Sequence, residues 1–153
     1  MPSRRAAIAM TEPELHRFLQ EEKIVTVATI GPNGRPHLMP LWFVADKDVI
    51  SAWTFGKSQK VKNLERRPQA TLQVEAGKEY QELRGAMLEC DVEIVLETDK
   101  VAEIGAAITR RYVGAPAGEV PDMVRMQAPK RVGLVFRPTR VASWDHRKLG
   151  GGY

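Results

Sequence analysis

Basic side chains and a hydroxyl gather in one short stretch, Trp53 to Leu64, with the sequence WTFGKSQKVKNL. The stretch is typical of a strand end, a turn at Gly56 and the start of a short helix. Ser58 can cap this helix and leave other amides of its first turn free to donate. A helix N-terminus favours anions, yet this one carries three lysines at or near it: Lys57, Lys60 and Lys62. Together these groups predict a phosphate site; the alternative interpretation is a solvated lysine-rich turn.

Most other chemical signatures are missing from the sequence. Residues 56–58 end like a Walker A loop, but Ser51 stands where the first glycine of that motif belongs. The histidines are far apart and there is one cysteine, so no zinc-ligand spacing exists and no metal is expected. No serine has the flanking glycines of a nucleophile elbow, and no carboxylate pair suits acid–base catalysis. If the protein is an enzyme, we expect a bound cofactor to supply the chemistry, and we assign no catalytic side chain.

Length and composition indicate one globular domain. The chain has 153 residues, of which 43% are apolar and 27% charged, a balance that argues against disorder. No apolar run is long enough to span a bilayer, so no membrane partner is expected. The one cysteine, Cys90, excludes an internal disulfide and suits a reducing cytosol, so a cytoplasmic location is predicted. Cys90 lies in a strand-like run, where a buried and inert thiol is expected.

Charge is distributed unevenly around a formal net charge of +4. Residues 75–99 are rich in Asp and Glu, whereas residues 131–148 are rich in Arg and Lys. A mild basic excess of this kind suits an anionic small ligand. No basic stripe is interleaved with aromatic residues on one face, so nucleic acid is not an expected partner.

Antiparallel strands are the elements that must position the lysine-rich stretch. The apolar patterns predict strands at 24–30, 37–45, 49–54, 70–75, 79–97 and 131–144, the first two paired as a hairpin and the fifth bent or interrupted at Gly85. Helices are predicted at 11–20, from Gly56 to before Pro68, and at 98–112. Residues 116–129 are expected to be irregular, with one helical turn around Met123. Six strands and three helices predict a mainly β fold, a small antiparallel barrel with helical cover.

The domain boundaries follow from these elements. Residues 1–10 contain an arginine pair with no sustained apolar region after it, so we expect a short loose arm and not a signal peptide. Residues 11–149 are predicted to form the single domain. Residues 150–153 contain three consecutive glycines and are expected to be a flexible tail.

Four segments carry a resemblance to a known family: VTVAT at 25–29, GRPHLMPLWFV at 34–44, KSQKVKNL at 57–64 with Pro68, and RPTRVASWD at 137–145. In this order and spacing they resemble the split β-barrel flavin and deazaflavin oxidoreductases, the pyridoxamine-phosphate-oxidase-like (PNPOx-like) superfamily. The likeness covers nearly the whole chain after Met10 and is strongest to the actinobacterial branch that uses coenzyme F420. It implies the fold known as the FMN-binding split β-barrel.

The resemblance also implies a homodimer with two cofactor sites at the subunit interface. One strand would line the cofactor ring with the residues His37, Met39, Pro40, Leu41, Trp42 and Phe43. The cofactor phosphate would be held by Lys57, Ser58, Lys60, Val61 and Asn63. The C-terminal residues Trp144 and Arg147 would lie near the site of the same or the other subunit, where basic groups could meet the acidic tail of F420 or the substrate. Adjacent strand residues point to opposite faces, so one of Trp42 and Phe43 can face the ring and the other the core.

The activity that the resemblance implies is that of an F420-dependent oxidoreductase. The reduced coenzyme would donate hydride to a small-molecule acceptor such as an enone or another conjugated carbonyl. Two alternatives stay open: an FMN-dependent oxidase or reductase of the same fold, and a carrier that binds F420 or flavin without turnover. Oxidation of pyridoxamine phosphate is not expected, because the basic and histidine residues that it requires are not all matched. The segment 114–129 is expected to help select the acceptor.

Overall fold

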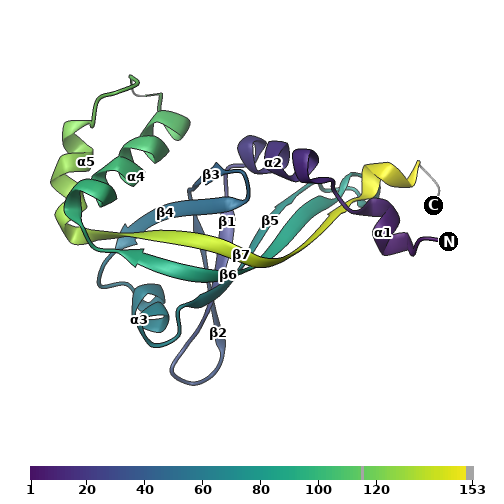
Figure 1. The fold of residues 1–153 in the computed structure, drawn as a ribbon, viewed down its shortest axis with the longest axis horizontal. Helices are drawn as coiled ribbons and strands as arrows, with labels where there is room; N and C mark the ends of the chain where they lie inside the picture. Colours follow the sequence, from purple (N-terminus) through teal and green to yellow (C-terminus); the bar gives the residue numbers. More distant parts are fainter. Residues whose placement is uncertain (115, 151–153) are drawn as a thin grey trace.

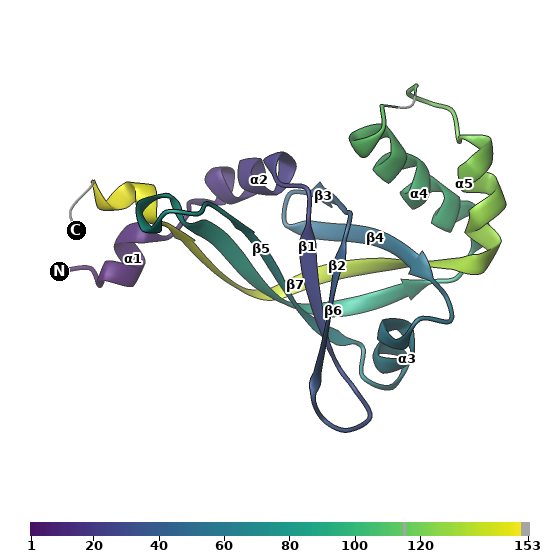
Figure 2. The same cartoon turned by 180° about the vertical axis from the view of Figure 1, so that it is seen from behind.

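One antiparallel sheet of seven strands forms the centre of the computed structural model, which describes residues 1–114 and 116–150 (Figure 1). The strands are β1 (Val25–Ile30), β2 (Pro36–Leu41), β3 (Val44–Asp46), β4 (Val49–Phe55), β5 (Gln69–Ala76), β6 (Arg84–Val95) and β7 (Arg131–Asp145). Their order across the sheet is β2-β1-β5-β6-β7-β4-β3. The sheet curls, so that β1 and β2 run steeply across β6 and β7 (Figures 1 and 2). The predicted mainly β fold of the split-barrel kind is confirmed.

Five α-helices accompany the sheet in the described part of the chain: α1 (Arg4–Ile8), α2 (Glu12–Glu21), α3 (Gln59–Arg66), α4 (Thr98–Tyr112) and α5 (Asp122–Gln127). Short 3-10 turns lie at η1 (Tyr80–Glu82), η2 (Ala128–Lys130) and η3 (His146–Leu149). Thr11 caps α2 as predicted, since its hydroxyl oxygen accepts a hydrogen bond from the backbone amide of Glu14 at 3.3 Å. α5 contains the helical turn predicted around Met123. α1 is not predicted, because the sequence pattern there indicates only a loose arm.

The β1–β2 hairpin forms as the sequence predicts. Buried and half-buried residues alternate along β1, which places one of its faces in the core. Gly34 takes a φ of +77° in the turn, a left-handed conformation that glycine adopts without a steric cost. The register pairs Val25 with Leu41 and Ile30 with Pro36. β2 has no second neighbour in the sheet, so it is an edge strand.

The predicted strand 37–45 is wrong as a single element. β2 ends at Leu41, and β3 begins at Val44 and pairs with β4 instead of β1. Because β2 and β3 are at opposite edges of the sheet, Trp42 and Phe43 carry the chain from one edge to the other. The break arises from tertiary contacts, since the Phe43 side chain is fully buried in the core and its carbonyl accepts hydrogen bonds from α4.

The predicted strand 79–97 is also corrected. Residues 80–82 form the turn η1, and β6 runs from Arg84 without a break at Gly85. The ring of Trp144 packs where a side chain at Gly85 would be, because a Cβ atom there would lie 2.5 Å from it. The irregularity lies at Glu89 and Cys90, where a bulge shifts the register against β7. Gly85 therefore serves close packing of the sheet and not a bend.

The hydrophobic core is formed by the sheet together with α2 and α3. Its largest fully buried side chains include Phe18 of α2, Leu72 of β5, Leu88 of β6 and Phe136 of β7. Cys90 is buried as predicted, and burial raises the pKa of its thiol to about 12. No helix among the described residues is both long enough and apolar enough to cross a membrane. Residues 151–153 of the predicted tail lie outside the described residues.

Candidate cofactor-binding site

Ser58 opens α3 at the point where the sequence predicts a phosphate. Its backbone has the extended conformation of an N-cap residue, but its hydroxyl makes no cap hydrogen bond, so the predicted side-chain cap is wrong. The Oγ atom is buried and has no hydrogen-bond partner. The first turn of α3 carries no acidic residue, and the first amides of a helix have no acceptor within it. The start of α3 therefore offers hydrogen-bond donors that the described chain does not use.

Lys60 is a buried cation in the first turn of α3. Lys60 is only 6% exposed, and its Nζ donates to the Thr54 hydroxyl at 2.7 Å. Burial lowers the pKa of Lys60, and the nearby Arg131 lowers it further. Neither side chain forms an ion pair with any described carboxylate. A buried cation without a counter-ion favours a bound anion.

His37 belongs to a polar hollow between the β1–β2 turn and α3. A pocket of about 500 Å³ is lined by His37, Gln59, Asn63 and residues 31–33, 35 and 36 of the turn. The Nδ1 atom of His37 is buried and lacks a hydrogen-bond partner. Among the described residues, this atom and Ser58 Oγ are the two buried side-chain polar atoms without one. Buried polar atoms are normally paired, so both are candidates for contact with a ligand.

The edge strand β2 exposes apolar side chains next to this hollow. Leu38 is 61% exposed and Met39 41%, and Pro40 is also exposed, while Leu41 is half-buried. Beyond the strand, Trp42 is half exposed and stacks on Tyr112 of α4 with ring centroids 4.5 Å apart. Phe43 is fully buried. Of the adjacent aromatic pair, Trp42 is thus the residue that a planar ligand can reach.

Val61 and Asn63 lie in the interior. Val61 is 1% exposed and belongs to the core, and Asn63 is fully buried. The Asn63 amide donates to Thr29 at 3.0 Å, and its carbonyl oxygen accepts from Gln59 and Arg66. These contacts seat α3 on β1. Lys57, in contrast, is exposed at the rim of the site.

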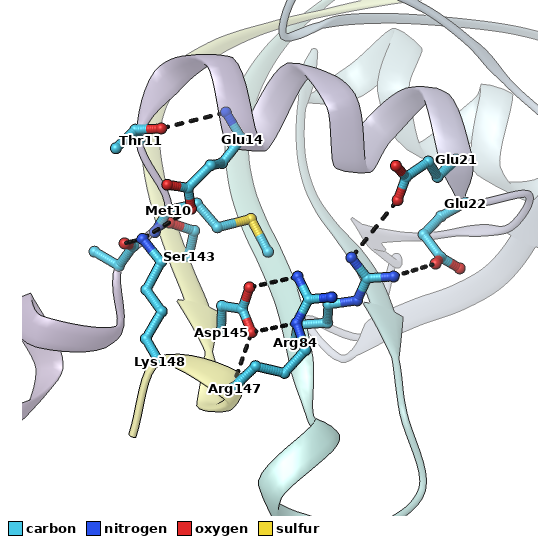
Figure 3. A network of polar contacts seen from close by, with 11 residues as sticks. Met10, Thr11, Glu14, Glu21, Glu22, Arg84, Ser143, Asp145, Arg147 and Lys148 are labelled. Carbon is cyan, nitrogen blue, oxygen red and sulfur yellow. Dashed lines mark hydrogen bonds and ion pairs between the residues drawn. The ribbon is translucent and has the colours of Figure 1, made fainter. Parts of the chain in front are cut away.

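The end of β7, which carries Trp144, and the turn η3, which carries Arg147, lie at the other end of the molecule from α3 (Figure 1). β7 separates Arg131 from Trp144, and its 15 residues span about 50 Å along their path at about 3.3 Å per residue. Arg147 forms a two-pronged contact with the Asp145 carboxylate at 2.9 and 2.7 Å, and it holds the pKa of that carboxyl below its usual value (Figure 3). One chain therefore does not bring these two residues to the lysines of α3.

Arg131 and Tyr112 have neighbours that the sequence does not predict. Arg131 opens the last strand, and only the pairing of β7 with β4 places it opposite Phe55, at the end of the lysine-rich stretch. Tyr112 is predicted only as part of the apolar side of its helix. No sequence spacing relates these residues to Phe55 or Trp42, because their proximity depends on which strands are neighbours.

The curled antiparallel sheet, the basic start of α3 and the apolar edge strand define a class of cofactor-binding split barrels. The sequence pattern described as pyridoxamine 5′-phosphate oxidase matches residues 11–145. The chain belongs to this family, as the resemblance predicts. A comparison with curated proteins finds no match.

Solved structures agree with this assignment. The conserved hypothetical protein Rv2991 from Mycobacterium tuberculosis is 39% identical, with a TM-score of 0.91 over 99% of this chain and 95% of that chain. An F420 reductase is 26% identical, with a TM-score of 0.66 over 82% of this chain and 94% of that one. A FAD-binding protein from Mesorhizobium loti is 13% identical, with a TM-score of 0.63 over 88% and 94% of the two chains, and shares the fold. The fold is thus one that holds flavin or deazaflavin cofactors.

Proposed function

We propose that the protein is an F420-dependent oxidoreductase that acts on a small acceptor such as an enone or another conjugated carbonyl. One observation carries the proposal. The unpartnered Ser58 hydroxyl, the unpartnered His37 nitrogen and the cation Lys60 lie on the two segments, β2 and the start of α3, that the family resemblance assigns to the cofactor. A ligand with a phosphate and a polar ring system would satisfy these groups.

The chain's own residues would bind and orient this cofactor. Lys57, Ser58 and Lys60 would hold the phosphate, and the exposed side of β2 with Trp42 would contact the ring system. When bound, F420 supplies hydride transfer. The protein would exclude water from one ring face and hold the acceptor in line with the other. Segment 114–129 would help to shape the acceptor pocket, since α5 lies within it.

F420 is preferred to FMN because an F420 reductase is similar over most of its length at 26% identity. FMN also has a phosphate and a tricyclic ring, so an FMN-dependent reaction remains the alternative to be tested. A carrier without turnover would use the same contacts. We also propose a homodimer in which Trp144 and Arg147 of the second subunit lie near the site, because β7 keeps these two residues far from α3 within one chain.

A parallel titration with F420 and FMN, followed by tryptophan quenching, tests the proposal. Selective binding of F420 supports it, and an acceptor screen with conjugated carbonyls then separates a reductase from a carrier. Lys57→Ala and Lys60→Ala are each expected to weaken F420 binding by about tenfold or more, because a hydrogen bond to a charged group contributes about 1.5–3 kcal/mol.

Lys62→Ala is the matched control. Lys62 is on the same helix and carries the same charge, but its side chain is exposed. Its variant is expected to bind F420 with an affinity close to that of the unmodified protein. Unchanged binding in the Lys57 and Lys60 variants, or selective binding of FMN, would reject the assignment.

A further inference from the structure

Hydrogen bonds hold the walls of the polar hollow between the β1–β2 turn and α3. Asn63 of α3 donates to the Thr29 hydroxyl of β1 at 3.0 Å, which ties the helix to the strand. In the turn, the Arg35 amide donates to the Asn33 side chain at 3.1 Å, and the Arg35 carbonyl accepts from the Gly31 amide at 2.9 Å. The hollow is therefore formed by the chain itself, and a ligand would not need to order its walls.

The charge of this hollow favours an anion. Arg35 and His37 are its two titratable side chains, and no acidic side chain is among the residues that line it. The exposed Arg35 forms no ion pair with any described carboxylate. Gln59 brings the first residue of α3 into the lining, and a helix N-terminus carries a partial positive charge. All three contributions attract negative charge.

The Nδ1 atom of His37 is the feature that points to a bound group. It is buried and has no hydrogen-bond partner, which costs free energy unless a ligand supplies the partner. A protonated imidazole donates from both of its nitrogens, and the guanidinium of Arg35 offers several donors in a planar fork. A carboxylate has two oxygens in one plane, so it can accept from both side chains.

We propose that this hollow is a second anion subsite, in which Arg35 and His37 bind a carboxylate of the ligand whose phosphate lies at the start of α3. Ser58, whose hydroxyl also lacks a partner, directly precedes Gln59, so the two subsites adjoin at the first turn of α3. This inference rests on the proposed function in taking the carboxylate to belong to the acidic tail of F420. Because FMN has a phosphate but no carboxylate, the hollow would favour F420 over FMN.

Two variants remove the proposed carboxylate contacts. Arg35→Met removes the charge, and His37→Phe removes the ring nitrogens while it keeps a flat ring. The measurements are dissociation constants for F420, for FMN and for riboflavin, which is FMN without its phosphate. Both variants are expected to weaken F420 binding by about tenfold or more and to leave FMN and riboflavin binding unchanged. Lys60→Ala, in contrast, is expected to weaken F420 and FMN binding alike, because both ligands carry a phosphate.

Two further variants serve as controls. His37→Asn restores a donor near the place of Nδ1, so it is expected to retain more F420 affinity than His37→Phe. Arg67→Met is the matched control for Arg35→Met. Arg67 is exposed at the end of α3 and does not line the hollow. Its variant is expected to bind all three ligands as tightly as the unmodified protein.

A measurement on the unmodified protein keeps the test independent of how the variants fold. Glutarate, a dicarboxylate without a ring or a phosphate, is added while the His37 ring resonances are followed by NMR. Sodium chloride at equal ionic strength corrects for screening. A saturable shift beyond this correction supports the inference, and a shift no larger than that caused by chloride overturns it.

The outcomes separate this inference from the proposed function. If neither F420 nor FMN binds, but glutarate shifts the His37 resonances and Arg35→Met abolishes that shift, the carboxylate subsite stands and the cofactor assignment fails. If folded Arg35→Met and His37→Phe variants bind F420 as tightly as the unmodified protein, the inference fails and the cofactor assignment stands. Equal losses of F420, FMN and riboflavin affinity would also overturn the inference, because they would indicate a general disturbance of the site.

Discussion

Lys60 is a residue of the candidate site that destabilises the folded state. A buried ammonium loses its hydration, and in the described chain it has one hydroxyl as its hydrogen-bond partner. No described carboxylate compensates the charge. Buried and unpaired charges are destabilising, and where they persist they commonly serve a ligand. Lys60 is therefore expected to lower the stability of the folded protein and to contribute to ligand binding.

Replacing this group with an apolar pair should stabilise the folded state. Lys60→Met together with Thr54→Val removes both hydrogen-bond partners, and we expect the free energy of unfolding to rise by about 1–3 kcal/mol at neutral pH while anion binding is lost. Burial lowers the pKa of Lys60 in the folded state, so the unmodified protein gains stability as the pH rises through that pKa and the lysine loses its proton. The difference between the two proteins should therefore shrink at alkaline pH.

Urea unfolding at neutral and alkaline pH measures this difference. Lys62→Met serves as the control, since Lys62 is exposed on the same helix and its replacement should change the unfolding free energy little at either pH. A double variant less stable than the unmodified protein at neutral pH would show that Lys60 is a structural residue and not a strained functional one.

At the scale of elements, the C-terminal end of α4 joins three parts of the fold. Arg111 donates to the carbonyls of Leu19, Gln20 and Glu22 at the end of α2 and to the carbonyl of Phe43 in the crossover between β2 and β3. A cation at a helix C-terminus also interacts favourably with the helix dipole. Tyr112 stacks on Trp42 in the same crossover. α4 thus holds the segment by which the chain passes between the two edges of the sheet.

Loss of this contact should loosen both α2 and the crossover. We expect Arg111→Met to lower the free energy of unfolding by about 2–3 kcal/mol, because one charged donor serves several backbone carbonyls. The near-ultraviolet circular dichroism of the stacked Trp42–Tyr112 pair should weaken as well. Arg110→Met is the control, since Arg110 makes a single 3.4 Å contact with the Glu119 carbonyl; similar losses in both variants would contradict the assigned role.

At the scale of the whole molecule, the ends of the chain hold one another far from the candidate site. Lys148 forms an ion pair with Glu14 at 2.8 Å and donates a hydrogen bond to the carbonyl of Ala9 (Figure 3). The Ser143 hydroxyl accepts a hydrogen bond from the backbone amide of Met10. This network keeps α2 and the end of β7 together. It also holds Trp144 and Arg147 far from α3. If these two residues and the lysines of α3 belong to one site, they must come from different subunits.

The edge strand β2 gives this dimer proposal a test. Sedimentation is expected to show a dimer, and Leu38→Arg should weaken dimerisation and F420 binding together by about tenfold or more, because a charge would replace apolar contact at a buried interface. Leu96→Arg is the control: Leu96 is 74% exposed in the loop after β6, and its replacement should change neither property. A monomer that binds F420 with full affinity would exclude an interface site.

The local elements and the basic segment of the candidate site could be predicted from the residues alone. The β1–β2 hairpin, the Thr11 cap of α2 and the alternating pattern of β6 depend on neighbours in the chain, which residue spacing records directly. The position of the lysines at the start of α3 could also be predicted, because a turn and a helix start are local structures. The family likeness follows from the order of these local segments.

Which residues become neighbours across the sheet could not be predicted from the sequence and depends on the packing of the whole fold. The break at Trp42 and Phe43 arises where Arg111 and Tyr112 bind a carbonyl almost 70 residues earlier in the chain. Arg131 lies opposite Phe55 because β7 pairs with β4, and the Ser58 hydroxyl is left without a partner although its sequence position favours a cap. Strand neighbours and buried contacts are set by the packing of the whole core, so no window of sequence contains them.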